Sequence, residues 1–255
     1  MNYHFLNNQL SNSDIAMLKK LEHKIIRNDV CAMEQWATYF AFEHPELVTD
    51  NITKRILRFY KIAVARNISR AMLNLGALHY NGVFVQRDFA KAVKLYKMAA
   101  GSDDSNVAAR AICNLGYCYY YGRSIAVDKE KAFSYFLKGT LLYNDPNCLY
   151  KLGDMYRYGE YVEKSEKMAY TLYKKAHSVH LCFDESFADI LVRLGECELY
   201  GIGTDQNVIS AMKRLTLAEG HLYEKIHIKK DPFAQEVLTK TKGLIKAAEE
   251  ILQGG

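Results

Sequence analysis

The chain has 255 residues, of which 49% are hydrophobic and 25% are charged, as in ordinary folded domains. Its net charge of +5 comes from 34 basic and 29 acidic residues that are mixed along the chain, so no concentrated basic face points to nucleic acid. No stretch approaches the run of about 18 apolar residues that a membrane-spanning helix needs. The three prolines are too few for a loop-rich β architecture and favour helices.

The chain begins without the basic and apolar regions of a signal peptide. Its six cysteines share no regular spacing and form no Cys-x-x-Cys motif. We therefore expect a cytoplasmic protein whose cysteines are reduced and mostly buried, with no metal and no cofactor.

The first expected element is a helix over about residues 13–27, with Ser13 as its N-cap. A faint helix–loop–helix unit follows. Trp36-Ala37 lies in its first helix, residues 44–51 form its loop, and residues 53–66 form its second helix. Four clearer units of the same kind come after it.

A Leu-Gly pair marks the four clearer units and recurs at offsets of 40, 37 and 42 residues. A second glycine follows the first by six residues every time. Self-similarity at a period of this size is the signature of repeat architectures. The pairs are Leu75-Gly76, Leu115-Gly116, Leu152-Gly153 and Leu194-Gly195, and the second glycines are Gly82, Gly122, Gly159 and Gly201.

Three further positions are fixed relative to the second glycine. The sixth residue after it is of a type that caps helix starts, the tenth is alanine, and the fourteenth is large and apolar. In chain order these are Asp88, Asp128, Ser165 and Asn207; then Ala92, Ala132, Ala169 and Ala211; then Tyr96, Phe136, Tyr173 and Leu215.

This spacing predicts a pair of helices in each unit. The glycine of the Leu-Gly pair has no Cβ, so a neighbouring helix can approach the first helix closely. The second glycine ends that helix in the left-handed C-cap conformation. A capped second helix follows, whose alanine is again a close-contact position and whose large residues fill the gap. Such units bury their apolar faces only when stacked, as in a solenoid.

After the fourth unit, residues 207–225 read as a longer second helix, and Asp231-Pro232 opens a final helix over about residues 232–252. Its apolar residues fall on one face, which suits a cap over the last repeat; the alternative is a face that recruits a partner helix. These residues are Phe233, Val237, Leu244, Ile245 and Ala248.

We expect one repeat domain over residues 1–255. It divides into an N-terminal capping helix (1–29), a degenerate repeat (30–67), four repeats (68–104, 105–144, 145–183 and 184–228) and a C-terminal capping helix (229–255).

Residues 71–82 with 88–100, and residues 111–122 with 128–136, resemble the Sel1-like repeat family, a relative of the tetratricopeptide repeats. The resemblance covers about residues 68–220, with the fainter unit before them. It implies a right-handed α-solenoid with a concave inner surface. It also implies a role as a scaffold or adaptor that holds a protein or peptide, rather than a role in catalysis. We expect a monomer or weak homo-oligomer.

In tetratricopeptide-like geometry the first helices line the concave groove, and Tyr and Arg are the residue types that dominate interface hot spots. Tyr121, Tyr158 and Tyr200 recur with the period and suit the core and the groove equally well. The candidate partner-binding residues are Arg70, Asn74, Tyr80, Asn81, Arg110, Asn114, Tyr117, Tyr120, Tyr121, Tyr150, Asp154, Arg157 and Tyr158.

Chemistry is the second hypothesis. Ser210 and Lys213 match the Ser-x-x-Lys of penicillin-recognising enzymes, and a cysteine-rich branch of similar repeats is linked to β-lactam binding. The accompanying motifs of those enzymes are absent, and Ser210 stands at a surface-helix position of the repeat. His177, His180 and Cys182 have a metal-like spacing but lack a partner cluster. RNA binding, the third hypothesis, would require a code repeated in each unit.

Overall fold

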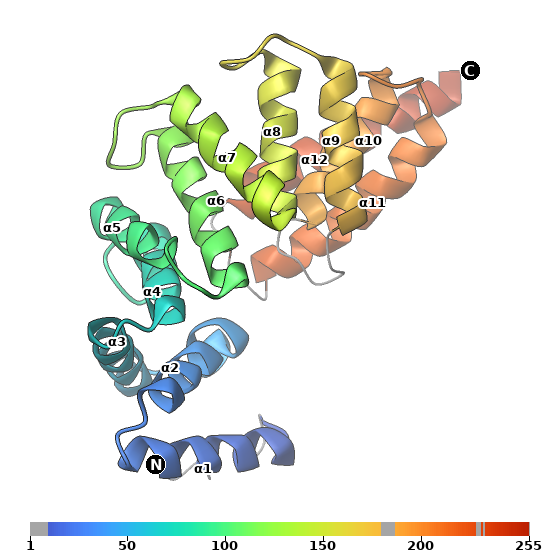
Figure 1. Ribbon diagram of the computed structural model, residues 1–255. Coiled ribbons are helices and arrows are strands. Elements are labelled where there is room, and N and C mark those ends of the chain that lie inside the picture. Colours follow the sequence, from blue (N-terminus) through green and yellow to red (C-terminus); the bar gives the residue numbers. More distant parts are fainter. Residues whose placement is uncertain (1–9, 180–186, 228–230, 232, 255) are drawn as a thin grey trace. The chain divides into compact units, whose positions relative to one another are not determined.

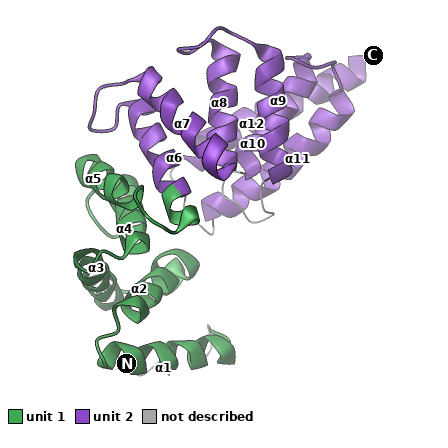
Figure 2. Cartoon of the chain, in the orientation of Figure 1, with its two compact units in different colours: residues 1–108 green, residues 109–255 purple. Residues whose placement is uncertain are grey.

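The computed structural model describes residues 10–179, 187–227, 231 and 233–254, which contain twelve α-helices and no β-strand (Figure 1). The chain divides into two compact units, Met1–Ala108 and Ala109–Gly255 (Figure 2). We call them unit 1 and unit 2. The expected all-α architecture of consecutive helix pairs is confirmed.

Unit 1 contains five helices and the first turn of a sixth. These are α1 (Asn12–Ile26), α2 (Val30–Thr38), α3 (Asp50–Ala65), α4 (Ser69–Asn81) and α5 (Phe89–Ala99). A π-helical turn (Tyr39–Glu43) and a 3₁₀ turn (Pro45–Leu47) connect α2 to α3. The pairs α2–α3 and α4–α5 are the faint repeat and the first clear repeat.

The core of the faint repeat contains Trp36, Phe40 and Tyr60, all fully buried. Arg55 of α3 stacks its guanidinium 4.4 Å from the centroid of the Trp36 ring and donates to both carboxylate oxygens of Glu22 on α1, each at 2.6 Å. This bidentate pair joins the N-terminal helix α1 to the faint repeat.

Two of the expected helix starts were wrong. Helix α1 is capped by Ser11 instead of Ser13, because Ser11 and Asp14 form a reciprocal capping box that satisfies two backbone N–H groups. Helix α3 begins at Asp50 instead of residue 53, because the Thr49 side chain accepts from the backbone N–H of Ile52. In both cases a hydroxyl residue slightly upstream supplies the cap.

Unit 2 contains most of α6 (Ser105–Tyr121) and six further helices. These are α7 (Lys129–Tyr143), α8 (Pro146–Tyr158), α9 (Glu166–Val179), α10 (Phe187–Tyr200), α11 (Val208–His227) and α12 (Ala234–Gly254). Helices α6, α8 and α10 are the first helices of their repeats, and α7, α9 and α11 are the second helices. Helix α12 packs on α11 and also contacts α10.

The internal mechanics of each repeat follow the expected rules. The second glycines adopt φ values of +68° to +73°, the left-handed region that a C-cap requires. The side chains of Asp88 and Asp128 accept from backbone N–H groups three residues later, and Ser165 and Asn207 do the same. The four repeat alanines are fully buried.

The large residue of the second helix packs directly against the Leu-Gly glycine of the first helix. A Cβ added at Gly76 would lie 2.7 Å from Cε1 of Tyr96, and one at Gly195 would lie 2.7 Å from Cγ of Leu215. Gly116 and Gly153 have the same relation to Phe136 and Tyr173. No side chain fits at these glycines, because the ring or leucine already fills that space.

The apolar face of helix α12 packs on α10 and α11. Leu238, Leu244 and Ala248 are buried against α10 and α11, together with Leu215 and Leu222. Phe233 is exposed, however, and Leu238 takes the core position in the first half of the helix. The expected start at Pro232 lies outside the described residues.

Candidate partner-binding site

The four candidates in unit 1 are divided between surface and interior. Arg70 is exposed and donates to Asp104 at 3.3 Å. Tyr80 is half-buried against the Phe89 ring, and the backbone carbonyl of Asn81 accepts from Arg87. Asn74 is buried.

The expected groove position of Asn74 is corrected by its contacts. Its amide donates to Thr38 at 3.0 Å and to Glu34 at 3.4 Å, both on α2. Burial raises the pKa of Glu34, and the hydrogen bonds from Thr38 and Asn74 only partly offset this. Asn74 therefore joins two repeats in the interior, where a polar group needs a partner.

On α6, Arg110 is exposed and Asn114 is half-buried. Tyr117 and Tyr120 are half-buried. The hydroxyl of Tyr117 is hydrogen-bonded to the hydroxyl of Tyr150 on α8, and Tyr120 donates to Glu160. Burial raises the pKa of both tyrosines above the ordinary value, so both hydroxyls are protonated at neutral pH. These rings line the junction between two repeats.

Asp154 of α8 is the centre of a buried ion network. Its carboxylate accepts from Nε and Nη2 of Arg193 on α10 at 2.6 and 2.7 Å, and from the hydroxyl of Tyr173 at 2.8 Å. The Lys151 ammonium donates to it at 3.1 Å. Burial alone would raise the pKa of Asp154, but the charges of Arg193 and Lys151 and the hydrogen bonds hold it well below the usual range.

Lys151 lies in a cage of aromatic rings. Its ammonium is 5.0–5.6 Å from the ring centroids of Tyr117, Tyr120, Tyr121 and Tyr150 and donates to the Tyr121 hydroxyl at 2.9 Å. Ring faces attract cations at this range. The cage compensates for the burial of the lysine and fixes the tyrosines around it.

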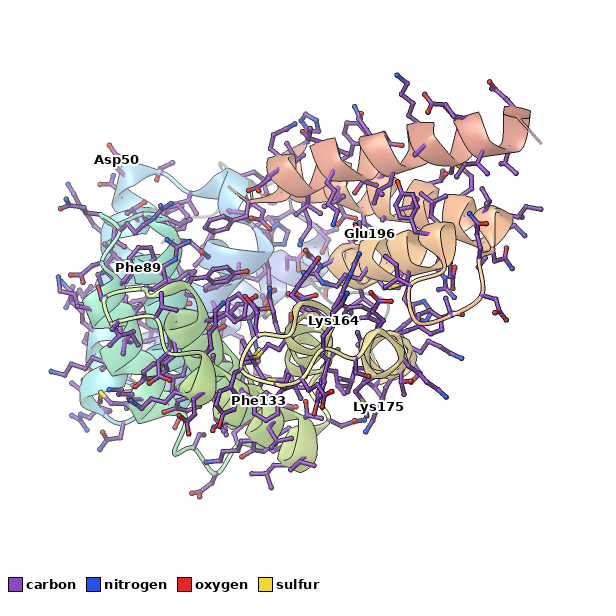
Figure 3. The ribbon with its side chains drawn as sticks, turned by 90° about the horizontal axis from the view of Figure 1, so that it is seen from above. Asp50, Phe89, Phe133, Lys164, Lys175 and Glu196 are labelled. Carbon is purple, nitrogen blue, oxygen red and sulfur yellow. The ribbon has the colours of Figure 1, made fainter. Side chains whose placement is uncertain are left out.

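A second ion network joins α8, α10 and α12. Glu196 of α10, labelled in Figure 3, accepts from Arg157 and from Lys240, each at 2.8 Å. Burial would raise the pKa of Glu196, but hydrogen bonds from these two cations and their charges lower it. The ion pair between Lys240 and Glu196 thus links α12 to α10, in addition to the apolar packing between these helices.

Tyr150, Asp154 and Arg157 therefore do not line an open groove. All three are buried, with 4–8% of their surface exposed. The physical reason is that neighbouring first helices approach closely: Tyr150 bonds to Tyr117 of the preceding repeat, whereas Asp154 and Arg157 bond to α10 of the next repeat. Sequence reasoning missed their partners Lys151, Arg193 and Glu196. Lys151 and Arg193 directly precede the leucine of a Leu-Gly pair, where Asn74 and Asn114 stand, and that charge substitution was the available signal.

The tyrosine that directly precedes the second glycine behaves differently. Tyr121, Tyr158 and Tyr200 are 47%, 58% and 51% exposed. They end α6, α8 and α10 at equivalent positions of three successive repeats. We call these three residues the tyrosine row. Cations flank two of the rings: the guanidinium of Arg123 lies 5.7 Å from the Tyr121 centroid, and that of Arg157 lies 5.3 Å from the Tyr158 centroid.

The residues considered for chemistry have structural partners. The Ser210 hydroxyl donates to the buried Glu198 at 2.7 Å, and Arg214 donates to the same carboxylate at 3.0 Å. Lys213 is exposed on α11. The His177 ring lies 5.8 Å from the Phe187 ring, whereas His180 and Cys182 lie outside the described residues.

The sequence profile of the Sel1 repeat matches four segments of the chain, residues 69–104, 109–143, 146–176 and 190–213. The chain is a Sel1 repeat protein. The first three matched Sel1 repeats correspond to the helix pairs α4–α5, α6–α7 and α8–α9, and the fourth covers most of α10 and the start of α11. Helices α1 to α3 and α12 lie outside the matched segments.

Two solved structures have the same fold. A Sel1 repeat protein from Oxalobacter formigenes is 20% identical with a TM-score of 0.61, over 87% of this chain and 89% of its own. A protective antigen of uropathogenic Escherichia coli with an SLR fold is 23% identical with a TM-score of 0.60, over 93% of this chain. This chain spans about half, 49%, of the length of the antigen. No curated protein matches the chain.

The described helices include none that is both long and apolar enough to cross a bilayer.

The Sel1 repeats of unit 2 combine buried ion pairs in the interior with a row of half-exposed tyrosine rings on the surface.

Proposed function

We propose that the protein is a scaffold or adaptor that holds a protein or peptide, and that the tyrosine row of unit 2 is its principal contact surface. The observation that carries the proposal is the exposure of Tyr121, Tyr158 and Tyr200, each about half-exposed at the same position of successive repeats. Tyrosine supplies a large, rigid contact area with a polar end, which suits a binding surface.

The buried residues next to the tyrosine row support the proposal. Lys151 donates to the Tyr121 hydroxyl, and Arg157 is fixed next to Tyr158 by its bond to Glu196. Tyr121 and Tyr158 therefore have fixed neighbours before a partner binds, which lowers the conformational entropy lost on binding. In this proposal the buried groove candidates Tyr150, Asp154 and Arg157 position the surface, and the exposed residues make the contacts.

The test is affinity capture from a lysate of the source cells with three baits. These are the wild type, the variant Tyr121→Ala/Tyr158→Ala/Tyr200→Ala, and the control Tyr223→Ala. Tyr223 lies on the second helix α11 and is 40% exposed, so it matches the row in chemistry but not in place. Circular dichroism and thermal melts establish that all three baits are folded.

A captured protein is then purified and its affinity measured by calorimetry. The proposal predicts that the triple variant weakens binding by at least about 30-fold, the effect of one hot-spot residue of about 2 kcal/mol. Tyr223→Ala should bind like the wild type. Equal binding by the wild type and the triple variant would contradict the proposal, as would the capture of no specific protein.

A further inference from the structure

Departures from the repeat pattern meet at one place in unit 2, between α6 and the start of α8. Cys148 lies four residues before Leu152, where the first two clear repeats have Ala71 and Ala111. Gly139 of α7 stands where the other repeats have Ala99, Ala176 and Ala218. The two changes compensate each other in volume, because a Cβ at Gly139 would overlap the Sγ atom of Cys148.

A second thiol and a carboxylate complete the cluster. Cys113 of α6 lies two residues before Leu115, a position that is Leu73, Tyr150 or Val192 in the other clear repeats. Asp145 is the N-cap of α8, and its Oδ1 accepts from the backbone N–H of Cys148 at 2.9 Å. The two Sγ atoms and a carboxylate oxygen of Asp145 lie within 4.8 Å of one another, and all three residues are buried.

The geometry points to a binding site for a thiophilic divalent cation of the zinc group, held by Cys113, Cys148 and Asp145. Zinc binds thiolate sulfur at about 2.3 Å and carboxylate oxygen at about 2.0–2.2 Å, so tetrahedral ligands are separated by about 3.6–3.8 Å. The cluster is already within reach of this spacing. Three protein ligands with a water in the fourth position form a recognised zinc arrangement.

Ordinary packing explains these residues less well. Two buried thiols alone would be small hydrophobes, and the alanine of the first two clear repeats would fill the position of Cys148 more simply. The capping role explains Asp145, but it does not require a thiol of α6 and a thiol of α8 next to the carboxylate. The α8 cap uses Oδ1 of Asp145, and the carboxylate also interacts with the two thiols. A bound cation would replace the thiol protons, because zinc binds thiolates.

Burial of the ligands means that the cation would enter while the chain folds, so the test loads it then. The purified chain is unfolded in denaturant with a thiol reductant and refolded with an excess of Zn²⁺. It is then desalted, and its zinc content is measured by mass spectrometry. The wild type should retain about one Zn²⁺ per chain, as a structural site does. Refolding with Cd²⁺ should produce the ultraviolet charge-transfer absorption of thiolate–cadmium bonds.

The matched variants separate the site from other thiols. Cys148→Ala introduces the residue of the first two clear repeats and should fold but lose the bound Zn²⁺ and the cadmium absorption. Asp145→Asn should weaken retention. The control Cys118→Ala removes another fully buried cysteine of α6 and should retain the ion.

Three results would overturn the inference: no retained Zn²⁺ in the refolded wild type, equal retention by Cys148→Ala, or equal loss by Cys118→Ala. The site is independent of the tyrosine row, so either proposal stands if the other fails.

Discussion

At the scale of single residues, Asp154 is a buried carboxylate whose charge is balanced by its neighbours. It is buried and shared by a bidentate arginine, a lysine and a tyrosine hydroxyl. A pair of this kind contributes little compared with a well-packed apolar core, but removing one partner leaves uncompensated charge behind.

We therefore expect Asp154→Asn to destabilise the protein by roughly 3–5 kcal/mol, because Arg193 and Lys151 would remain buried without their carboxylate. Urea unfolding at neutral pH measures this. Asp205→Asn, at an exposed site, is the control and should stay within about 0.5 kcal/mol of the wild type. A loss below about 1 kcal/mol for Asp154→Asn would mean that the network is not desolvated as described.

The same carboxylate predicts the response to acid. The folded pKa values of Asp154 and Glu196 are lower than the ordinary values of about 4 that apply to the unfolded chain. Between the two values the folded state binds fewer protons, so stability rises with pH. This contribution is complete above the ordinary pKa and is lost as the pH falls through the lower folded values.

Unfolding free energies measured in urea at a series of pH values test this. The wild type should lose stability as the pH falls below about 4. The double variant Asp154→Asn/Glu196→Gln should be less stable at neutral pH but show a shallower loss. An identical slope in both proteins would contradict the linkage.

A third prediction at the residue scale concerns two glycines, at which substitution by alanine should change the stability in opposite directions. Gly153→Ala should destabilise by about 1–3 kcal/mol, because its Cβ would overlap the Tyr173 ring. Gly220→Ala, inside α11 with no atom within 4 Å of the added Cβ, should stabilise by about 0.5–1 kcal/mol. Thermal melts measure whether each variant is more or less stable than the wild type. A change in the same direction for both variants would contradict the close packing of the Leu-Gly glycine.

At the scale of elements, the repeat rules operate locally, and this is why they could be predicted. Each rule depends on a few positions within one repeat. These are the second glycine with its left-handed backbone, the N-cap six residues later, and the large residue that packs on the Leu-Gly glycine. The caps at Ser11 and Thr49 were misplaced because several hydroxyl residues stood within one turn of each helix start. The π-helical turn at Tyr39–Glu43 had no sequence signal that we used.

Helix α12 gives the prediction at this scale. Leu238→Ala should cost about 2–5 kcal/mol, because Leu238 is buried with Leu215 and Leu222 in the core that α12 closes. Leu252→Ala, 49% exposed near the end of the same helix, should change stability by less than about 0.5 kcal/mol. Urea unfolding of both variants decides it. Similar small effects would favour the alternative in which α12 is a detachable, partner-recruiting face.

At the scale of the whole molecule, the fold could be predicted from the sequence, but the site only in part. The repeat period places Tyr121, Tyr158 and Tyr200 at equivalent positions, yet period alone left them between core and surface. The burial of Tyr150 and Asp154 depends on Arg193, one repeat later, and no local rule names that partner. Cys113 and Cys148 approach for the same reason, since stacking brings together residues about one repeat apart.

The most direct test of the central claim is site-specific photocrosslinking in the source cells. A photoreactive phenylalanine derivative replaces Tyr121, Tyr158 or Tyr200 in turn, and Tyr223 in the control. The scaffold account predicts that one protein crosslinks from the three row positions and does not crosslink from position 223. The same crosslinks from all four positions, or crosslinks from 223 alone, would contradict the claim that the tyrosine row is the contact surface.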